Sequence, residues 1–245
     1  VLFEDDGYRN IANQTIDYIV GNLYDCKAIG FRGSQGAHSD YYNLSKTERI
    51  DLPNPEIDEW CYVNLSAQTA SFLFRAYWIL ERPDLREIGR LVLDKLIAKS
   101  RDNDLFHVFK PESSESHRLM LLCDWASLLN VLMDSHNWDN SNQKSLAMAV
   151  EIAGTLVSVF YDKENGGFFD TAEDKNAVGY LKLREKPLPD NLLAIEGLLK
   201  LYNATLDNAY HEIVNDSLSA FTKTYGDYGE YAASYGLLQE RFLNP

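Results

Sequence analysis

One layout occurs three times along this chain: a helical stretch, a short polar turn, and a second helical stretch with alanine and leucine on one face. The three copies span residues 76–97, 128–157 and 197–221. Long polar loops alternate with these short links. Repeats of this length predict stacked helical hairpins, and the alternation predicts that every long loop lies at the same end of the stack.

Two of the long loops also begin alike. LYD at residues 23–25 precedes GF at residues 30–31, and FYD at residues 160–162 precedes GGFF at residues 166–169. We interpret both as equivalent exits from the second helix of a hairpin. Loops carried by a rigid scaffold are common places for functional sites, so we expect a site at this end of the helices.

Apolar residues recur at three- and four-residue steps, which is typical of amphipathic helices. The pattern predicts eight helices, over residues 8–23, 60–80, 84–98, 119–133, 145–161, 191–202, 209–224 and 228–242. Only VFKP after His107 and GYLKLR around Leu181 suggest short extensions. The predicted fold class is all-α, with antiparallel hairpins in a ring or arc, and residues 1–245 are treated as one domain.

Composition excludes several functions. The 245 residues carry a net charge of −14, which disfavours a nucleic-acid partner or an anionic membrane surface, and no apolar run reaches the length of a membrane span. The cysteines at 26, 61 and 123 are far apart, and no two of the five histidines are spaced i, i+4. We therefore expect free thiols and no metal site. Phosphate-loop and dinucleotide motifs are absent, so no cofactor is expected.

Several short motifs, taken in order, resemble the carboxy-terminal part of a family of thioredoxin-fused proteins. These are the spermatogenesis-associated thioredoxin-domain proteins and their microbial relatives. The matching residues are Gly30-Phe31, Ser34-Gln35, Ala37, Tyr41-Tyr42-Asn43-Leu44, Leu121-Leu122-Cys123-Asp124-Trp125-Ala126, Gly166-Gly167-Phe168-Phe169-Asp170 and Arg184-Glu185-Lys186-Pro187-Leu188-Pro189-Asp190-Asn191.

The resemblance implies an α/α toroid of the six-hairpin glycosidase type, the architecture of N-acylglucosamine 2-epimerase and cellobiose 2-epimerase, with a pocket at the loop end. It also implies a thioredoxin-like partner domain, which this chain lacks because it has no CxxC motif. Eight helices fit the later part of a toroid or a shortened one. The chain begins in a charged stretch without a signal-peptide pattern, which is typical of a piece of a longer, cytoplasmic protein.

The chain departs from the family pattern at one motif. Relatives usually read S-Q-D-A-D, whereas Ser34-Gln35-Gly36-Ala37-His38 stands here, so both aspartates are missing. A later Trp-Asn-Ala stretch keeps only Asn64. If the two aspartates carry chemistry in relatives, this domain has lost it.

His38 and Asp124 are the catalytic candidates. A histidine titrates near neutral pH and can act as a general base, although a solvated loop histidine is an equally good interpretation of His38. Asp124 opens an apolar helix, and a buried carboxylate there needs a partner. Arg184, Lys186 and His117 are the candidates for that partner.

Other polar and aromatic residues of the motifs and loops are candidates for binding a small molecule or sugar. They are Ser34, Gln35, Tyr41, Tyr42, Tyr62, Asn64, Trp125, Phe169, Asp170, Arg184, Asp190 and Asn191. Aromatic rings stack on sugars, but core packing is their more common role, and Asp190 and Asn191 are also favoured helix caps.

Two functions stay open at this stage. One is a degenerate pocket-bearing module that binds a ligand and works with a thioredoxin-like domain; the missing aspartates favour it. The other is a carbohydrate-active epimerase, isomerase or hydrolase that uses His38 and Asp124 as acid and base. Both predict that Gln35, His38, Tyr41, Asp124, Arg184 and Asp190 surround one concavity.

Overall fold

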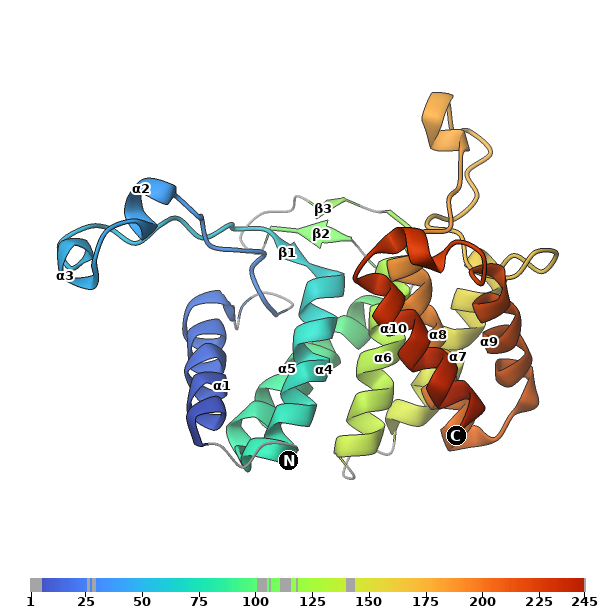
Figure 1. The fold of residues 1–245 in the computed structure, drawn as a ribbon, viewed down its shortest axis with the longest axis horizontal. Helices are drawn as coiled ribbons and strands as arrows, with labels where there is room; N and C mark the ends of the chain where they lie inside the picture. The colour runs from blue at the N-terminus through green and yellow to red at the C-terminus, as the bar shows by residue number, and fades with distance from the viewer. Residues whose placement is uncertain are drawn as a thin grey trace.

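The computed structural model describes residues 6–25, 27, 30–100, 105, 107–110, 116–117, 119–139 and 144–244. Helices dominate it, and three hairpins form two layers (Figure 1). The hairpins are α4 (Val63–Leu80) with α5 (Pro83–Ser100), α6 (Leu122–Trp138) with α7 (Lys144–Phe160), and α8 (Leu188–Thr205) with α9 (Asn208–Ala220). The all-α prediction of antiparallel hairpins is confirmed.

The remaining elements flank the hairpins. They are α1 (Asp6–Tyr18), the π-helix η1 (Ile19–Leu23), the short α2 (Ser39–Tyr42) and α3 (Lys46–Arg49), the 3-10 helices η2 (Gly179–Lys182) and η3 (Tyr225–Tyr228), and α10 (Tyr231–Leu243). No helix among the described residues is long and apolar enough to cross a membrane.

The inner layer consists of α4, α6, α8 and α10, and these four helices run in the same direction. Gln68 of α4 donates to Ser127 of α6, and Arg75, two turns later, reaches Asp134 of α6. The pairs Asn130–Leu193 and Asp134–Lys200 join α6 to α8 in the same order. Because all four inner helices are parallel, their amino termini meet at one end, together with the long loops.

Helix α6 forms the centre of the core. It packs between α4 and α8, and every residue from Asp124 to Ser135 is buried. Gly197 of α8 allows the close approach to α6, because a Cβ there would lie 2.9 Å from Leu129. A side chain at position 197 would therefore push the two inner helices apart.

The ends of the hairpins opposite the long loops are tight. Glu81 follows the last residue of α4 and Leu206 the last residue of α8, and both are in the left-handed conformation with φ of 58°. Pro83 then opens α5, as its missing N–H predicts. Helix α8 begins at Leu188, before the predicted residue 191, because Pro189 fits in a first turn where no amide donor is needed.

At the other end, short extended segments connect the loops. The strands β1 (Cys61–Tyr62), β2 (Val108–Phe109) and β3 (Ser116–His117) pair antiparallel in that order. A further bridge joins Leu121 to Thr171. The predicted extension after His107 is thus present, whereas GYLKLR forms the 3-10 turn η2, which Gly179 starts at a φ of +60°.

Both predicted helix exits lie at this end. Leu122, the first residue of α6, donates its amide to Asp170 of the second exit loop, and Asp58, close to the start of α4, donates to Ser34 of the first. The prediction that both loops share one end of the stack is confirmed, because α4 and α6 are parallel neighbours.

The first long loop then leaves the helical layers. Figure 1 shows α2 and α3 in an arm that projects away from the inner helices. Ser45 caps α3 in a capping box with Glu48, and Arg49 lies over the rings of Tyr41 and Tyr42 at 5.5 and 5.9 Å. These contacts are internal to the arm, so they stabilise its own local structure.

Candidate functional site

The inner helices leave a concave face that contains two adjoining hollows. The larger has a volume of about 500 Å³ and lies between α4, α8 and α10; the smaller has about 150 Å³ and lies over α4, α6 and α8. Gln68, Arg75, Leu193 and Glu196 line both. Their combined size is in the usual range for small-molecule sites, which makes this face a candidate binding site.

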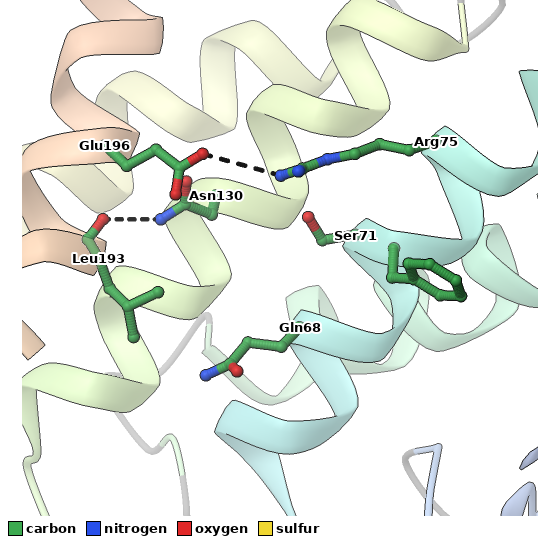
Figure 2. A pocket seen from close by; sticks show the side chains of 7 residues that line it. Gln68, Ser71, Arg75, Asn130, Leu193 and Glu196 are labelled. Atoms are coloured by element: carbon green, nitrogen blue, oxygen red, sulfur yellow. Dashed lines mark hydrogen bonds and ion pairs between the residues drawn. The ribbon is translucent and has the colours of Figure 1, made fainter. Parts of the chain in front are cut away.

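A set of ion pairs forms the floor of the smaller hollow. Arg75 of α4 extends toward Glu196 of α8, with Asn130 of α6 between them (Figure 2), and its guanidinium lies 3.8 Å from the Glu196 carboxylate. The same guanidinium is 2.9 Å from Asp134, which is also 2.9 Å from Lys200. Asp134 is only 1% exposed, and the two cations compensate the cost of burying its charge.

Neighbouring polar groups fix this floor. Ser71 donates to Asp134. Asn130 donates to the carbonyl of Leu193 at 2.7 Å and accepts from Lys200 at 3.0 Å. Side chains held in this way present their remaining donors to the hollow without further ordering, which favours recognition of a polyhydroxylated or charged ligand.

Asp190, in the first turn of α8, lines the larger hollow and is half-buried. Burial, followed by the charges of Asp170 and Asp124, raises the pKa of Asp190 above its usual value. The structure gives it no hydrogen bond or ion pair with any described residue. A carboxyl group that faces a cavity and holds its proton more tightly than usual is a candidate general acid.

Asp124, the predicted catalytic aspartate, lies at the loop end and is 1% exposed. Its partner is His107, which precedes β2, whereas Arg184 and Lys186 bind other groups. The side chain of His117, the third candidate partner, lies outside the part that the structure describes. The imidazole Nδ1 lies 3.0 Å from Asp124 Oδ2, and the backbone amide of Asn64 donates to Oδ1 at 3.2 Å. Burial raises the pKa of Asp124, and the hydrogen bond to that carboxylate raises the pKa of His107.

Four of the predicted ligand-binding residues therefore lie near Asp124. Tyr62 and Asn64 flank the start of α4, and the Tyr62 ring centroid is 6.0 Å from that of His107. Asp170 and Asp124 lie close enough to Asp190 for their charges to raise its pKa. This group forms the loop-end part of the site.

Five other predicted residues lie elsewhere, in the first loop and its arm. Tyr41 donates to Asn54, Gln35 donates to the carbonyl of Pro55, and the ring of Tyr42 packs edge-on against that of Tyr41. His38 caps α2 and is exposed, as is Ser34. The predicted pairing of His38 with Asp124 is absent from the described contacts, because the chain turns outward into the arm after residue 34.

Four more predicted residues have structural contacts. Trp125 is 1% exposed and packs in the core. Asn191 is fully buried and holds the second exit loop. Arg184 donates to the carbonyls of Thr171 and Val159 and lies 4.1 Å from the ring centroid of Phe169, which fixes both side chains in the loop.

Sequence reasoning missed the residues of the concave face. Charged residues in a predicted helix usually indicate a solvent-exposed face. This applied to Arg75, Asp134, Glu196 and Lys200. One signal was available: Asp134 lies in the apolar run LLNVLMD, and a charge in such a run needs buried partners.

The arrangement defines a class of fold, the α/α toroid of the six-hairpin glycosidase type. Cellobiose 2-epimerase from Spirochaeta thermophila matches with a TM-score of 0.64 at 15% identity, covering 88% of this chain and 54% of its own. A D-mannose isomerase matches with a TM-score of 0.64 at 10% identity, covering 89% of this chain and 52% of its own.

An α-1,6-mannanase from a Salegentibacter species, solved as an inactive variant in complex with α-1,6-mannotetrose, matches with a TM-score of 0.54 at 14% identity. That match covers 66% of this chain and 47% of the mannanase. The present chain therefore spans about half the length of these proteins. No family model matches the sequence, and no curated protein matches it.

Proposed function

We propose that the concave face of the inner helices binds a carbohydrate. The observation that carries this proposal is the larger hollow, which combines fixed charged groups with an exposed aromatic ring. Arg75, Asp190 and Ser234 offer donors and acceptors to hydroxyl groups, and the ring of Tyr231, 43% exposed, offers an apolar surface. Sugars offer both kinds of surface, because their hydroxyl groups form hydrogen bonds and the faces of their rings carry apolar C–H groups.

The fold supports the same ligand class. The epimerase, the isomerase and the mannanase are named for reactions on sugars, and the structure of the mannanase contains α-1,6-mannotetrose. At 10 to 15% identity the likeness to them concerns the fold alone. The choice of carbohydrate as ligand therefore rests on the chemistry of the hollow.

A second candidate function is acid catalysis on that sugar, and Asp190 is the observation that favours it. Its raised pKa suits a general acid, and Glu196, which lines the same hollow, forms ion pairs with Arg75, Lys200 and Arg241. Two carboxyl groups with different environments are what sugar hydrolysis requires. In this version Asp190 replaces His38 and Asp124 as the acid.

Calorimetric titration with glucose, mannose, cellobiose and an α-1,6-linked mannobiose tests the proposal. We expect one of these sugars to bind, and Asp190→Asn to weaken its binding about tenfold, which corresponds to ~1.4 kcal/mol. Asp40→Asn, an exposed carboxylate in α2, is the matched control and should leave binding unchanged. Equal affinity of both variants and the wild type would remove Asp190 from the site.

The same samples separate binding from catalysis. Product analysis by NMR over a day should show conversion of the bound sugar if Asp190 acts as an acid, and Asp190→Asn should slow it by about 100-fold or more. Binding without conversion supports the module interpretation. Failure of all four sugars to bind at millimolar concentration contradicts both functions for this ligand set.

We also propose, from the sequence motifs, that the chain belongs with a thioredoxin-like domain in a longer protein of the thioredoxin-fused family. The motifs around Gly166–Asp170 and Arg184–Asn191 support it. A full-length sequence without such a domain would contradict the proposal, and the sugar-binding proposal does not depend on it.

A further inference from the structure

A second cluster of reactive side chains lies at the loop end, outside both hollows. His107 precedes β2, and Cys123 and Asp124 lie in the first turn of α6. One donor atom from each residue, a ring nitrogen, the thiol sulfur and a carboxylate oxygen, lies within 4.8 Å of the other two. None of the three lines the concave hollows.

The backbone holds the three residues in place independently of their side chains. The amide of Val63 donates to the carbonyl of His107 at 3.0 Å, and β1 pairs with β2 on the following residues. Cys123 and Asp124 are adjacent in a helix that is buried on both sides. The cluster therefore joins two rigid frameworks, as a preorganised ligand set requires.

The geometry fits three ligands of one metal ion better than it fits a catalytic triad. In a thiol–imidazole–carboxylate triad, the ring separates the nucleophile from the carboxylate, so the outer two groups lie far apart. Here the Cys123 sulfur and an Asp124 oxygen are within 4.8 Å of each other and of the same ring nitrogen. The 3.0 Å between His107 Nδ1 and Asp124 Oδ2 suits two ligands bonded to one metal at about 2.0–2.2 Å.

The surroundings favour a cation. Asp124 and Asp190 both lie near the Cys123 thiol, so two carboxyl groups surround the proposed ligand atoms. The backbone amide of Asn64 donates to Asp124, and the buried side-chain oxygen of the same residue has no hydrogen-bond partner among the described residues. A cation, or a water molecule bound to it, can satisfy such an acceptor.

We propose that His107, Cys123 and Asp124 form a binding site for a divalent zinc ion. Imidazole, thiolate and carboxylate are all zinc ligands, and three protein ligands leave a fourth position for water or another molecule. The sequence spacing did not suggest this site, because the histidine comes from a different loop, 16 residues before the cysteine. The proposal is separate from sugar binding on the concave face.

The test uses metal-free protein and cobalt(II) as a spectroscopic stand-in for zinc. We expect one equivalent of cobalt to bind with a thiolate charge-transfer band, and one equivalent of zinc to displace it. Cys123→Ser should abolish the band and weaken zinc binding by more than about 100-fold, beyond the loss typical of an outer-shell change. Cys61→Ser is the matched control, because Cys61 is a buried free thiol in β1 outside the cluster.

A second variant distinguishes loss of zinc binding from loss of the fold. His107→Gln should keep the circular dichroism of the wild type and still lose tight zinc binding. Absence of stoichiometric zinc binding by the wild type would overturn the proposal, and so would a charge-transfer band that persists in Cys123→Ser. Neither result would alter the expected sugar titration, so the two proposals can fail separately.

Discussion

The two exit loops of the molecule share one backbone design but differ in how they are fastened. Tyr24 pairs with Phe31 in the first exit, and Tyr161 with Phe168 in the second. The ring centroids of these pairs are 5.4 and 5.3 Å apart, at interplanar angles of 49° and 47°. The backbone hydrogen bonds also correspond, since Asp25 donates to Gly30 and Asp162 to Gly167.

The fastening residues lie at the same position of the next inner helix. Ser66, the fourth residue of α4, accepts from the amide of Phe31 at 3.1 Å. Asn191, the fourth residue of α8, accepts from the amide of Phe168 at 2.6 Å and also donates to the carbonyls of Phe168 and Pro187, both at 2.9 Å. A hydroxyl and an amide thus do the same task, but the amide makes more bonds.

The larger number of hydrogen bonds made by Asn191 indicates that the second exit loop is the more rigidly held of the two. The second exit leads directly to Asp170 and, through Glu185, to the start of α8 with Asp190. The first exit leads into the projecting arm. The more firmly held loop is therefore the one beside the acidic candidates, whereas the arm contributes no described contact to them.

Asn191→Ala should give the largest difference between the two exits. It removes three hydrogen bonds from a fully buried position, so we expect the free energy of unfolding to fall by about 3 kcal/mol. The matched change at the first exit, Ser66→Ala, should cost only about 1 kcal/mol. Urea denaturation followed by circular dichroism measures both, and equal losses would show that the two fastenings are equivalent.

Glycine substitutions sharpen the comparison at the turns themselves. Gly166 has a φ of +70°, and an added Cβ would lie 2.4 Å from the carbonyl oxygen of Asp216, so Gly166→Ala should destabilise by about 2 kcal/mol. At the first exit, a Cβ on Gly30 would meet only side chains, of Val92 and Ser66, at 3.0–3.1 Å.

We therefore expect Gly30→Ala to cost about half as much, roughly 1 kcal/mol, because side chains can move and the backbone conformation at position 30 is ordinary. Thermal unfolding of the two variants gives the order. If Gly30→Ala proves the more damaging, the packing of the first exit against α4 and α5 is tighter than the contacts suggest.

The smallest effect concerns the ion pair that each exit carries. Lys186 lies 2.7 Å from Asp162, and this hydrogen bond holds the pKa of Asp162 well below its usual range. A lowered carboxyl pKa stabilises the fold above the unfolded value of about 4, and the contribution is lost as pH falls through the folded value. Lys186→Met should thus cost less than about 1 kcal/mol at pH 7, and the deficit should shrink below pH ~4.

Arg32→Met, which removes the 2.9 Å pair with Asp25, is the counterpart in the first exit. Unfolding measured from pH 7 to pH 3 compares the two. A Lys186→Met deficit that stays constant across this range would assign the loss to the bond between Lys186 and the carbonyl of Gly166, at 2.6 Å, in place of the ion pair.

Much of the fold followed from periodicity and repeats. The hairpins, the alternation of short turns and long loops, and the equivalence of the two exits all depend on local pattern, which a sequence displays. The predicted start of α8 at residue 191 is three residues late, because Pro189 lies inside the first turn of the helix. Boundaries depend on single residues and are harder to predict than elements.

The site was less predictable because it depends on which helix faces meet. Arg75, Asp134, Glu196 and Lys200 come from three helices, and no spacing in the sequence links them. His107 likewise approaches Asp124 only through strand pairing. The sequence favours His38 as a site residue because its loop begins at the same end of the helices as Asp124. The loop then continues into the projecting arm, and the sequence does not show the direction of that arm.

The left-handed residues at the far turns have an evolutionary consequence. Glu81 and Leu206 close their hairpins with almost no spare chain, so an inserted residue there would shift an entire outer helix against the core. The long loops at the opposite end can change length without moving any helix. Descent within this fold should therefore preserve the tight turns and diversify the long loops, so that the loop end changes while the helical frame stays constant.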